Sequence, residues 1–141
     1  LIIAALKVTT DLERMGDLSV NIAERVVELN AEPQLKPYID LPVMAEKVRA
    51  MTRDALDSFV TGDVVQARRV LVADNEVDAL NVQVFRELLT YMLEDAHTIS
   101  RATRIIFISK YLERLADHAT NVAEEVIFAI EGRDVRHRNM S

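Results

Sequence analysis

The sequence predicts an all-α protein, an antiparallel three-helix bundle preceded by one further long helix. Half of the 141 residues are hydrophobic, whereas glycine and proline each occur only three times. A chain with so few turn-forming residues favours long helices over many short strands. Apolar residues also recur at the α-helical spacing through most of the chain. We therefore expect four long helices.

The first predicted element is a helix over residues 1–31. Its apolar side chains fall on one stripe of an ideal helix, formed by Leu1, Ala5, Val8, Leu12, Met15, Ser19, Ile22, Ala23 and Val26. Pro33 and Pro37 cannot continue this helix, because each lacks a backbone N–H and restricts the residue before it. Residues 32–40 are therefore expected to be a proline-containing linker.

The second and third helices are marked by their expected first residues. Asp40 can act as an N-cap with Pro42 in the first turn, and Asp63 can act as the next N-cap after Gly62. The second helix is expected to end near residue 60 and the third near Asp95. Their apolar stripes contain Met44, Val48, Met51, Ala55 and Phe59, and then Val70, Ala73, Val77, Val84, Leu88 and Tyr91.

The last helix is expected to begin at an N-cap formed by Thr98 or Ser100 and to end at Gly132. Short connections make consecutive helices antiparallel, so residues 41–132 should form a three-helix bundle. Residues 133–141 are expected to be a basic flexible tail. The apolar stripe of this helix is formed by Ile105, Ile108, Leu112, Leu115, Ala119, Val122, Ala123 and Val126.

The chain contains an internal repeat. "LERMGDLSVNIAERV" at residues 12–26 and "LERLADHATNVAEEV" at residues 112–126 are identical at eight of fifteen aligned positions. The stretches lie on the first and last predicted helices, which indicates a duplicated three-helix unit. Residues 1–31 are then the last helix of an incomplete first repeat, and we expect the N-terminal part of a longer protein to be missing. Its exposed stripe needs another surface, in the same chain or in a homodimer.

Composition excludes several classes of function. The 23 acidic residues outnumber the 17 Lys and Arg residues, and the resulting net charge of −6 argues against nucleic acid as a partner. The absence of cysteine excludes disulfides and thiolate metal sites and fits a reducing compartment. No apolar run approaches the length of a membrane span, so direct membrane insertion is not expected.

Polar and acidic residues border the apolar face of the fourth predicted helix and interrupt that of the third. Glu113, Asp117 and Asn121 follow one another at i, i+4 spacing, and Asp74, Asp78 and Asn81 overlap the apolar face of the third helix. Partly buried carboxylates need protons, arginines or a cation to offset their charge. Oxygen ligands favour a hard cation, and a metal is predicted to join the third helix to the fourth at Asp74, Asp78, Glu113, Asp117 and Asn121.

Three alternatives are compatible with the pattern. In the first, Arg14, Arg25, Arg101, Arg104 and Arg114 neutralise the acids as solvated surface pairs. In the second, the chain is a structural or dimerisation module without metal. In the third, it is a ferritin-like di-metal carboxylate protein, although the paired Glu-x-x-His motifs of that class are absent. No enzyme signature is found, so catalysis is not predicted.

The residues that carry these motifs resemble the PhoU family of phosphate-transport accessory and phosphate-signalling proteins. The similar segments are "ERMGDLSVN", "ERLADHATN" and "DNEVDAL". The resemblance implies two three-helix repeats and adds Glu13, Asp17 and Asn21 as metal ligands. It implies a cytoplasmic regulator of phosphate uptake that contacts a sensor histidine kinase and the ATPase of the phosphate ABC transporter. The implied metals are Fe, Mn, Mg or Zn, without a choice among them.

Overall fold

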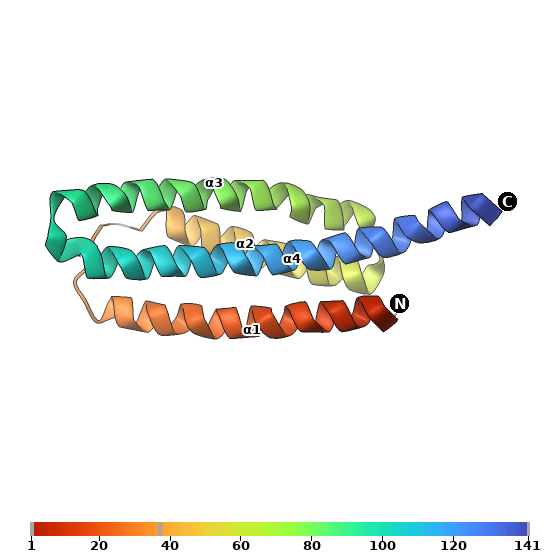
Figure 1. Ribbon diagram of the computed structural model, residues 1–141, viewed down its shortest axis with the longest axis horizontal. Coiled ribbons are helices and arrows are strands. Elements are labelled where there is room, and N and C mark those ends of the chain that lie inside the picture. The colour runs from red at the N-terminus through yellow and green to blue at the C-terminus, as the bar shows by residue number, and fades with distance from the viewer. Residues whose placement is uncertain (1, 37, 141) are drawn as a thin grey trace.

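The computed structural model describes residues 2–36 and 38–140, with side chains described as far as Gly132. The prediction of an all-α fold is confirmed (Figure 1). Four long helices are joined by a linker, a glycine turn and a single 3₁₀ turn. The elements are α1 (Ile2–Asn30), α2 (Asp40–Thr61), α3 (Val64–Glu94), η1 (Ala96–Thr98) and α4 (Ile99–Met140).

Helices α2, α3 and α4 form the predicted up-down-up bundle, in which each helix contacts the other two. Helix α1 lies on the opposite side of α4 from α3 (Figure 1). Among the described residues, the backbone of α1 comes close to α4 but not to α2 or α3. Helix α4 is therefore the one element that contacts all three other helices.

The core consists of the apolar stripes that the sequence predicts for α2, α3 and α4. On α2, Met44, Val48, Met51 and Ala55 are buried, whereas Phe59 is half-buried at the edge. On α3 the buried members are Val70, Val77, Val84 and Leu88. Helix α4 buries the whole predicted set, Ile105, Ile108, Leu112, Leu115, Ala119, Val122, Ala123 and Val126.

The predicted face of α1 is only partly correct. Leu12 and Val26 are more than a third exposed, and the buried residues are Val8, Met15, Leu18 and Leu29. Three of these, with the half-buried Ile22, recur every seven residues. That spacing belongs to a narrow seam between two helices, because a helix with a single neighbour buries a thinner stripe than one in a bundle.

The predicted caps are confirmed at one of three helix starts. The carboxylate of Asp63 accepts a hydrogen bond from the Gln66 N–H at 3.1 Å. Asp40 is the first residue of α2 rather than its cap, and Ile39 occupies the N-cap position without a side-chain hydrogen bond. Asp40 can still interact favourably with the helix dipole from there.

Neither Thr98 nor Ser100 caps α4. The Thr98 hydroxyl donates to the carbonyl oxygens of Tyr91 and Asp95, at 3.0 and 2.7 Å. The turn between α3 and α4 is held instead by the Asp95 carboxylate, which accepts from the His97 N–H at 2.9 Å. The chain passes from η1 directly into α4, so no separate cap residue is needed.

The predicted end of the last helix is wrong. Helix α4 continues through Gly132 to Met140, so residues 133–140 belong to a helix rather than to an irregular tail. A glycine within a helix costs only about 1 kcal/mol relative to alanine, and no proline follows to end the helix. The left-handed glycine is Gly62 at the end of α2, with φ of 70°.

The linker between α1 and α2 is fixed by ion pairs to the C-terminal part of α3 and the N-terminal part of α4. Glu32 pairs with Arg104 and lies within 4.0 Å of Arg101, whose guanidinium also donates to the Pro33 carbonyl oxygen at 3.2 Å. Lys36 is half-buried, and its side chain, which is 7% exposed, pairs with Glu87 of α3. These contacts hold the start of α2 beside the turn between α3 and α4.

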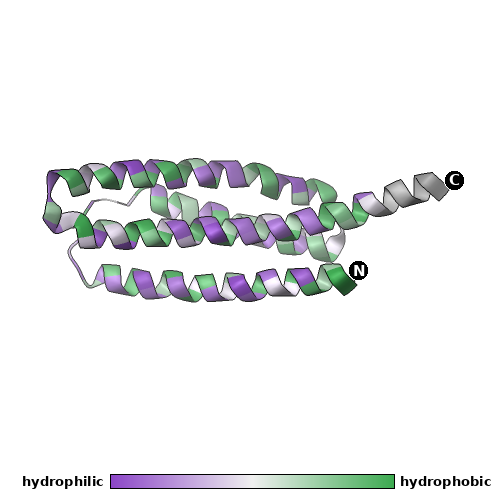
Figure 2. Cartoon of the chain, viewed as in Figure 1, coloured by the Kyte–Doolittle hydropathy of each residue, from purple (hydrophilic) through white to green (hydrophobic). Residues whose placement is uncertain are grey.

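Hydrophobic and hydrophilic residues alternate along all four helices, and hydrophobic residues are found on outer faces as well as between the helices (Figure 2). Within the described chain, no helix has a segment that is both long and apolar enough to cross a membrane.

Gly62→Ala is expected to destabilise the fold by about 1 kcal/mol, because an alanine in the left-handed region is strained. The added Cβ would also lie 3.4 Å from Ile130 Cδ1. The matched control is Gly132→Ala, where a Cβ meets nothing within 4 Å and the helix interior favours alanine. Urea unfolding should show opposite shifts for the two variants, and equal shifts would contradict the assigned roles.

Candidate metal centre

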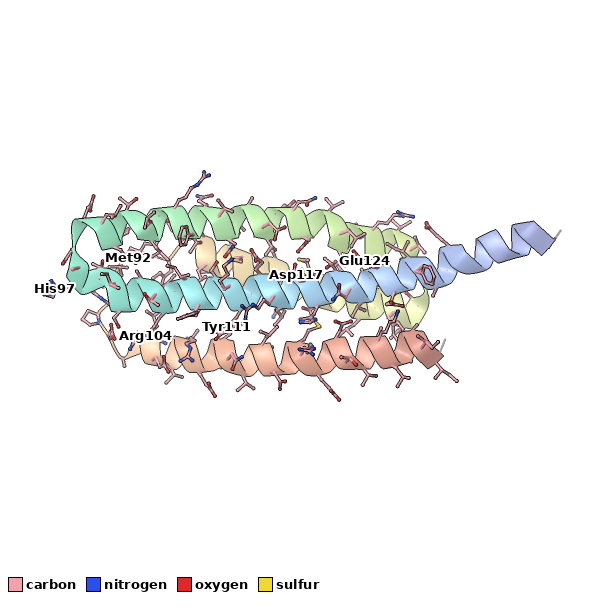
Figure 3. All side chains as sticks on the ribbon, in the orientation of Figure 1. Met92, His97, Arg104, Tyr111, Asp117 and Glu124 are labelled. Atoms are coloured by element: carbon pink, nitrogen blue, oxygen red, sulfur yellow. The ribbon has the colours of Figure 1, made fainter. Side chains whose placement is uncertain are left out.

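Three carboxylates from two helices converge on the face that α3 and α4 share. Asp74 and Asp78 lie one turn apart on α3, and Asp117 faces them from the middle of α4 (Figure 3). One carboxylate oxygen of each lies within 4.8 Å of those of the other two. Asp74 is half-buried, whereas Asp78 and Asp117 are exposed, so the cluster opens to solvent on one side. We call these three residues the acidic cluster.

One oxygen of the acidic cluster has no partner. The Oδ1 atom of Asp74 is buried without a hydrogen-bond partner among the described residues. Burial, followed by repulsion from Asp78, Asp117, Glu113 and Glu124, raises the pKa of Asp74 to about 6. Burial and the charges of Asp78 and Glu113 also raise the pKa of Asp117. The negative charge is therefore incompletely compensated.

Arginines do not neutralise the cluster. Within the part of the chain whose side chains are described, no Lys or Arg nitrogen lies within 4.0 Å of Asp74, Asp78 or Asp117. Arg25 pairs with Glu28, Arg104 with Glu28 and Glu32, and Arg114 lies over the ring of Tyr111. The alternative of solvated arginine pairs thus does not describe this site.

Glu113 lies beside the acidic cluster but is bound to other groups. Its Oε2 accepts a hydrogen bond from the Asn81 amide at 2.6 Å, and its Oε1 lies 3.7 Å from Lys110. The Ser109 hydroxyl donates to the side-chain oxygen Oδ1 of Asn81 at 2.7 Å and completes a polar chain between α3 and α4. Sequence reasoning missed Ser109, although a serine between buried Ile108 and Leu112 interrupts the apolar stripe and could have indicated it.

Asn121 points to the other side of α4. Its amide nitrogen lies 3.3 Å from the Asp11 carboxylate of α1, and His118 Nδ1 lies 2.8 Å from the same oxygen. Asn121 is therefore engaged with α1 rather than with the acidic cluster. Asp11 and the role of His118 were not found from the sequence, because only the orientation of α1 brings them together.

The predicted metal-binding motif on α1, formed by Glu13, Asp17 and Asn21, faces no acidic cluster on another helix among the described residues. Glu13 and Asp17 are exposed and Asn21 is half-buried. The one group of three potential ligands found in this part of the chain is the acidic cluster. Helix α1 lies across α4 from α3, so Asp74 and Asp78 cannot complete a site with Glu13 and Asp17.

The acidic cluster has the chemistry that a hard cation requires. Mg²⁺, Ca²⁺ and Mn²⁺ take carboxylate oxygens, and two oxygens bound to one such ion lie at most about 4 to 5 Å apart, which is twice the metal–oxygen distance. One oxygen from each of the three carboxylates lies within 4.8 Å of the other two, and the unpaired Asp74 oxygen is a ligand atom that no donor among the described residues occupies. The described residues therefore fit a bound cation.

The fold and the site define a class of protein. It is an all-α protein of four helices with a carboxylate cluster between two of them. The sequence model for the PhoU domain matches residues 1–26 and 41–126. The gap between the two matched segments spans the linker. The chain belongs to the PhoU family.

Relatives and solved structures agree with this assignment. The chain is 46% identical over 137 residues to the phosphate-specific transport system accessory protein PhoU homologue of Zymomonas mobilis, covering 97% of this chain and 58% of that protein. The homologue of the same name from Aquifex aeolicus is 45% identical, with coverages of 99% and 63%. The chain thus spans about three fifths of the length of these relatives.

The fold is also that of solved PhoU structures. The crystal structure of PhoU from Pseudomonas aeruginosa superposes with a TM-score of 0.89 at 38% identity, covering 94% of this chain and 64% of that one. PhoU from Streptococcus pneumoniae, a phosphate transport system regulatory protein, gives a TM-score of 0.81 at 25% identity, with coverages of 93% and 62%.

Asp74→Asn is expected to stabilise the metal-free protein at pH 7.5 by on the order of 1 to 2 kcal/mol, because a half-buried charge that neighbouring carboxylates repel is removed. The folded pKa of about 6 lies above the ordinary carboxyl value. Wild-type stability from this group is therefore present at low pH and is lost as pH rises through about 6. The gain should vanish near pH 4.

Urea unfolding at both pH values, in the presence of a chelator, measures the effect. Asp57→Asn, at an exposed position on α2, is the control and should leave stability unchanged. A gain that is equal at both pH values would contradict a raised Asp74 pKa.

Proposed function

We propose that this chain belongs to a cytoplasmic regulator of phosphate uptake and phosphate-starvation signalling that acts by protein contacts. The observation that carries the proposal is the similarity, over nearly the whole chain, to proteins named as accessory to phosphate-specific transport. The partners proposed are a sensor histidine kinase and the ATPase of the phosphate ABC transporter. No catalytic role is proposed.

A bound metal is the second part of the proposal. Asp74, Asp78 and Asp117 would hold an oxygen-ligated cation, one of Fe, Mn, Mg or Zn, with Glu113 beside them. Such a cation supplies positive charge where the protein itself supplies none within salt-bridge distance among the described residues. It would join α3 to α4. Because a cation stabilises the ionised carboxylate, it would also lower the pKa of Asp74 toward the ordinary value.

A homodimer is the third part of the proposal. Among the described residues the backbone of α1 comes close to α4 but not to α2 or α3, and large apolar side chains are exposed on its other faces, which a second copy could cover. These residues include Ile2, Ile3, Leu6, Val20 and Val27. Sedimentation equilibrium of the purified chain tests this part independently of the metal.

Metal binding is expected to stabilise the protein, and the effect should depend on the acidic cluster. At a cation concentration about 100 times the Kd, binding stabilises the folded state by about 2.7 kcal/mol. Thermal unfolding with added Mn²⁺ should show this shift for the wild type and lose it for Asp74→Asn with Asp78→Asn. Elemental analysis should show the same loss.

Glu13→Gln with Asp17→Asn is the matched control, because it removes from α1 two carboxylates that are also four residues apart. That variant should keep the metal-induced stabilisation. If it loses the effect and the Asp74 and Asp78 variant keeps it, the α1 motif rather than the acidic cluster binds the metal.

The signalling role is tested with purified partners. The chain should bind the cytoplasmic part of a phosphate sensor kinase or the transporter ATPase in surface plasmon resonance. Binding to neither would favour the alternative of a structural or dimerisation module. The metal measurements above remain informative in that case, because they use the chain alone.

A further inference from the structure

Helix α3 carries an exposed apolar stripe that the acidic cluster does not use. Val82, Phe85, Leu89 and Leu93 lie three or four residues apart and are each 40% or more exposed. That spacing places them on one face of the helix. The stripe begins one turn after Asp78 and runs to the turn that joins α3 to α4. We call these four residues the α3 stripe.

Helix α4 provides the second wall of a groove along this stripe. The Ser109–Asn81 and Thr98–Tyr91 hydrogen bonds fix the antiparallel register of the two helices. A cavity of about 340 Å³ opens between them, with Val82 and Phe85 on one wall and Ile106 on the other. Ile99, at the start of α4, is also exposed.

The base of the cavity requires no polar ligand. Asn81 and Ser109 line it, but their polar atoms are already bound to each other and to Glu113. An apolar side chain entering the cavity would therefore leave no buried polar group without a partner. Aromatic and aliphatic anchors in such cavities dominate the binding energy of many protein interfaces.

The rim of the cavity is basic, in a chain whose net charge is −6. Arg86 lines it from α3 and Lys110 from α4. Among residues with described side chains, no carboxylate lies within 4.0 Å of Arg86, and the carboxylate nearest Lys110 is Glu113 at 3.7 Å. A partner with an acidic group at this position would gain charge-assisted hydrogen bonds.

We propose that this groove binds an amphipathic helix of a different protein. Its apolar face lies along the α3 stripe, one apolar side chain fills the cavity, and a carboxylate meets Arg86. At about 1.5 Å per residue the stripe from Val82 to Leu93 is roughly 16 Å long, which is three turns of a partner helix. A third helix can bind in the groove between two antiparallel helices when the ridges of its side chains pack into the grooves on their surfaces. The inference rests on the proposed function as a contact-based regulator.

The test uses a designed 14-residue helical peptide with four leucines at the spacing of the α3 stripe and one glutamate placed to reach Arg86. A second peptide differs only by lysine in place of that glutamate. With the ¹⁵N-labelled wild-type chain, the glutamate peptide should shift amide signals of residues 82–93 and 99–110 and should bind at least about tenfold more tightly than the lysine peptide.

Three variants locate the interaction. Phe85→Ser should weaken binding of the glutamate peptide at least about tenfold, and Arg86→Glu should reverse the preference between the two peptides. Arg69→Glu, at an exposed position elsewhere on α3, should change neither. Circular dichroism verifies that each variant folds. Because Phe85 and Arg86 are substituted separately, the charge test stands even if Phe85→Ser fails to fold.

Three outcomes would overturn the proposal. Signals that shift instead along a second groove, which is lined by Met15 of α1, Val48 of α2 and Leu115 of α4, would place the peptide elsewhere. An unchanged preference in Arg86→Glu would remove the charge argument. A dimer that dissociates in Phe85→Ser during sedimentation would show that a second copy covers the stripe. None of these outcomes decides whether the chain binds a sensor kinase or a transporter ATPase.

Discussion

The structure depends on the burial of α4 on several faces at once. Helix α4 contacts α1, α2 and α3, and it is the helix with the largest share of the buried core. Alanine occupies four of its fully buried positions, Ala102, Ala116, Ala119 and Ala123, each with 0% exposure. Small side chains allow neighbouring helix axes to approach, since the interaxial distance depends on the residues at the contact. A larger residue at any of these positions would have to displace another helix.

The sequence predicted the helices well because the signals that define them are local. Helical periodicity and the scarcity of glycine and proline gave four helices, and Asp63 marked the start of α3 by its own hydrogen bond. The end at Gly132 was mispredicted because glycine ends a helix only where the chain must turn. No proline occurs in residues 133–141 to end the helix. The face of α1 was mispredicted because periodicity gives a stripe but not the number of neighbours that cover it.

The candidate site was partly predictable for the same reason. Asp74 and Asp78 interrupt an apolar face, so the pattern alone shows that they need compensation. The facing residue on α4 could be predicted to within one turn, but side-chain partners separate Asp117 from Glu113 and Asn121. Those partners, Asn81 and Asp11, lie on other helices. Their proximity depends on helix register, which a single sequence does not encode locally.

Helix α1 is attached to the rest of the chain by one seam, and that seam contains polar positions. Asp11 meets His118 and Asn121, Lys7 pairs with Glu125, and Arg104 lies 3.7 Å from Glu28. Polar groups within an otherwise apolar seam fix the register of two helices at some cost in stability. Separation of α1 from α4 would expose one side of α4, while α2, α3 and α4 would keep their contacts with one another. This arrangement would allow α1 to separate from α4 as a smaller unit while α2, α3 and α4 stay folded.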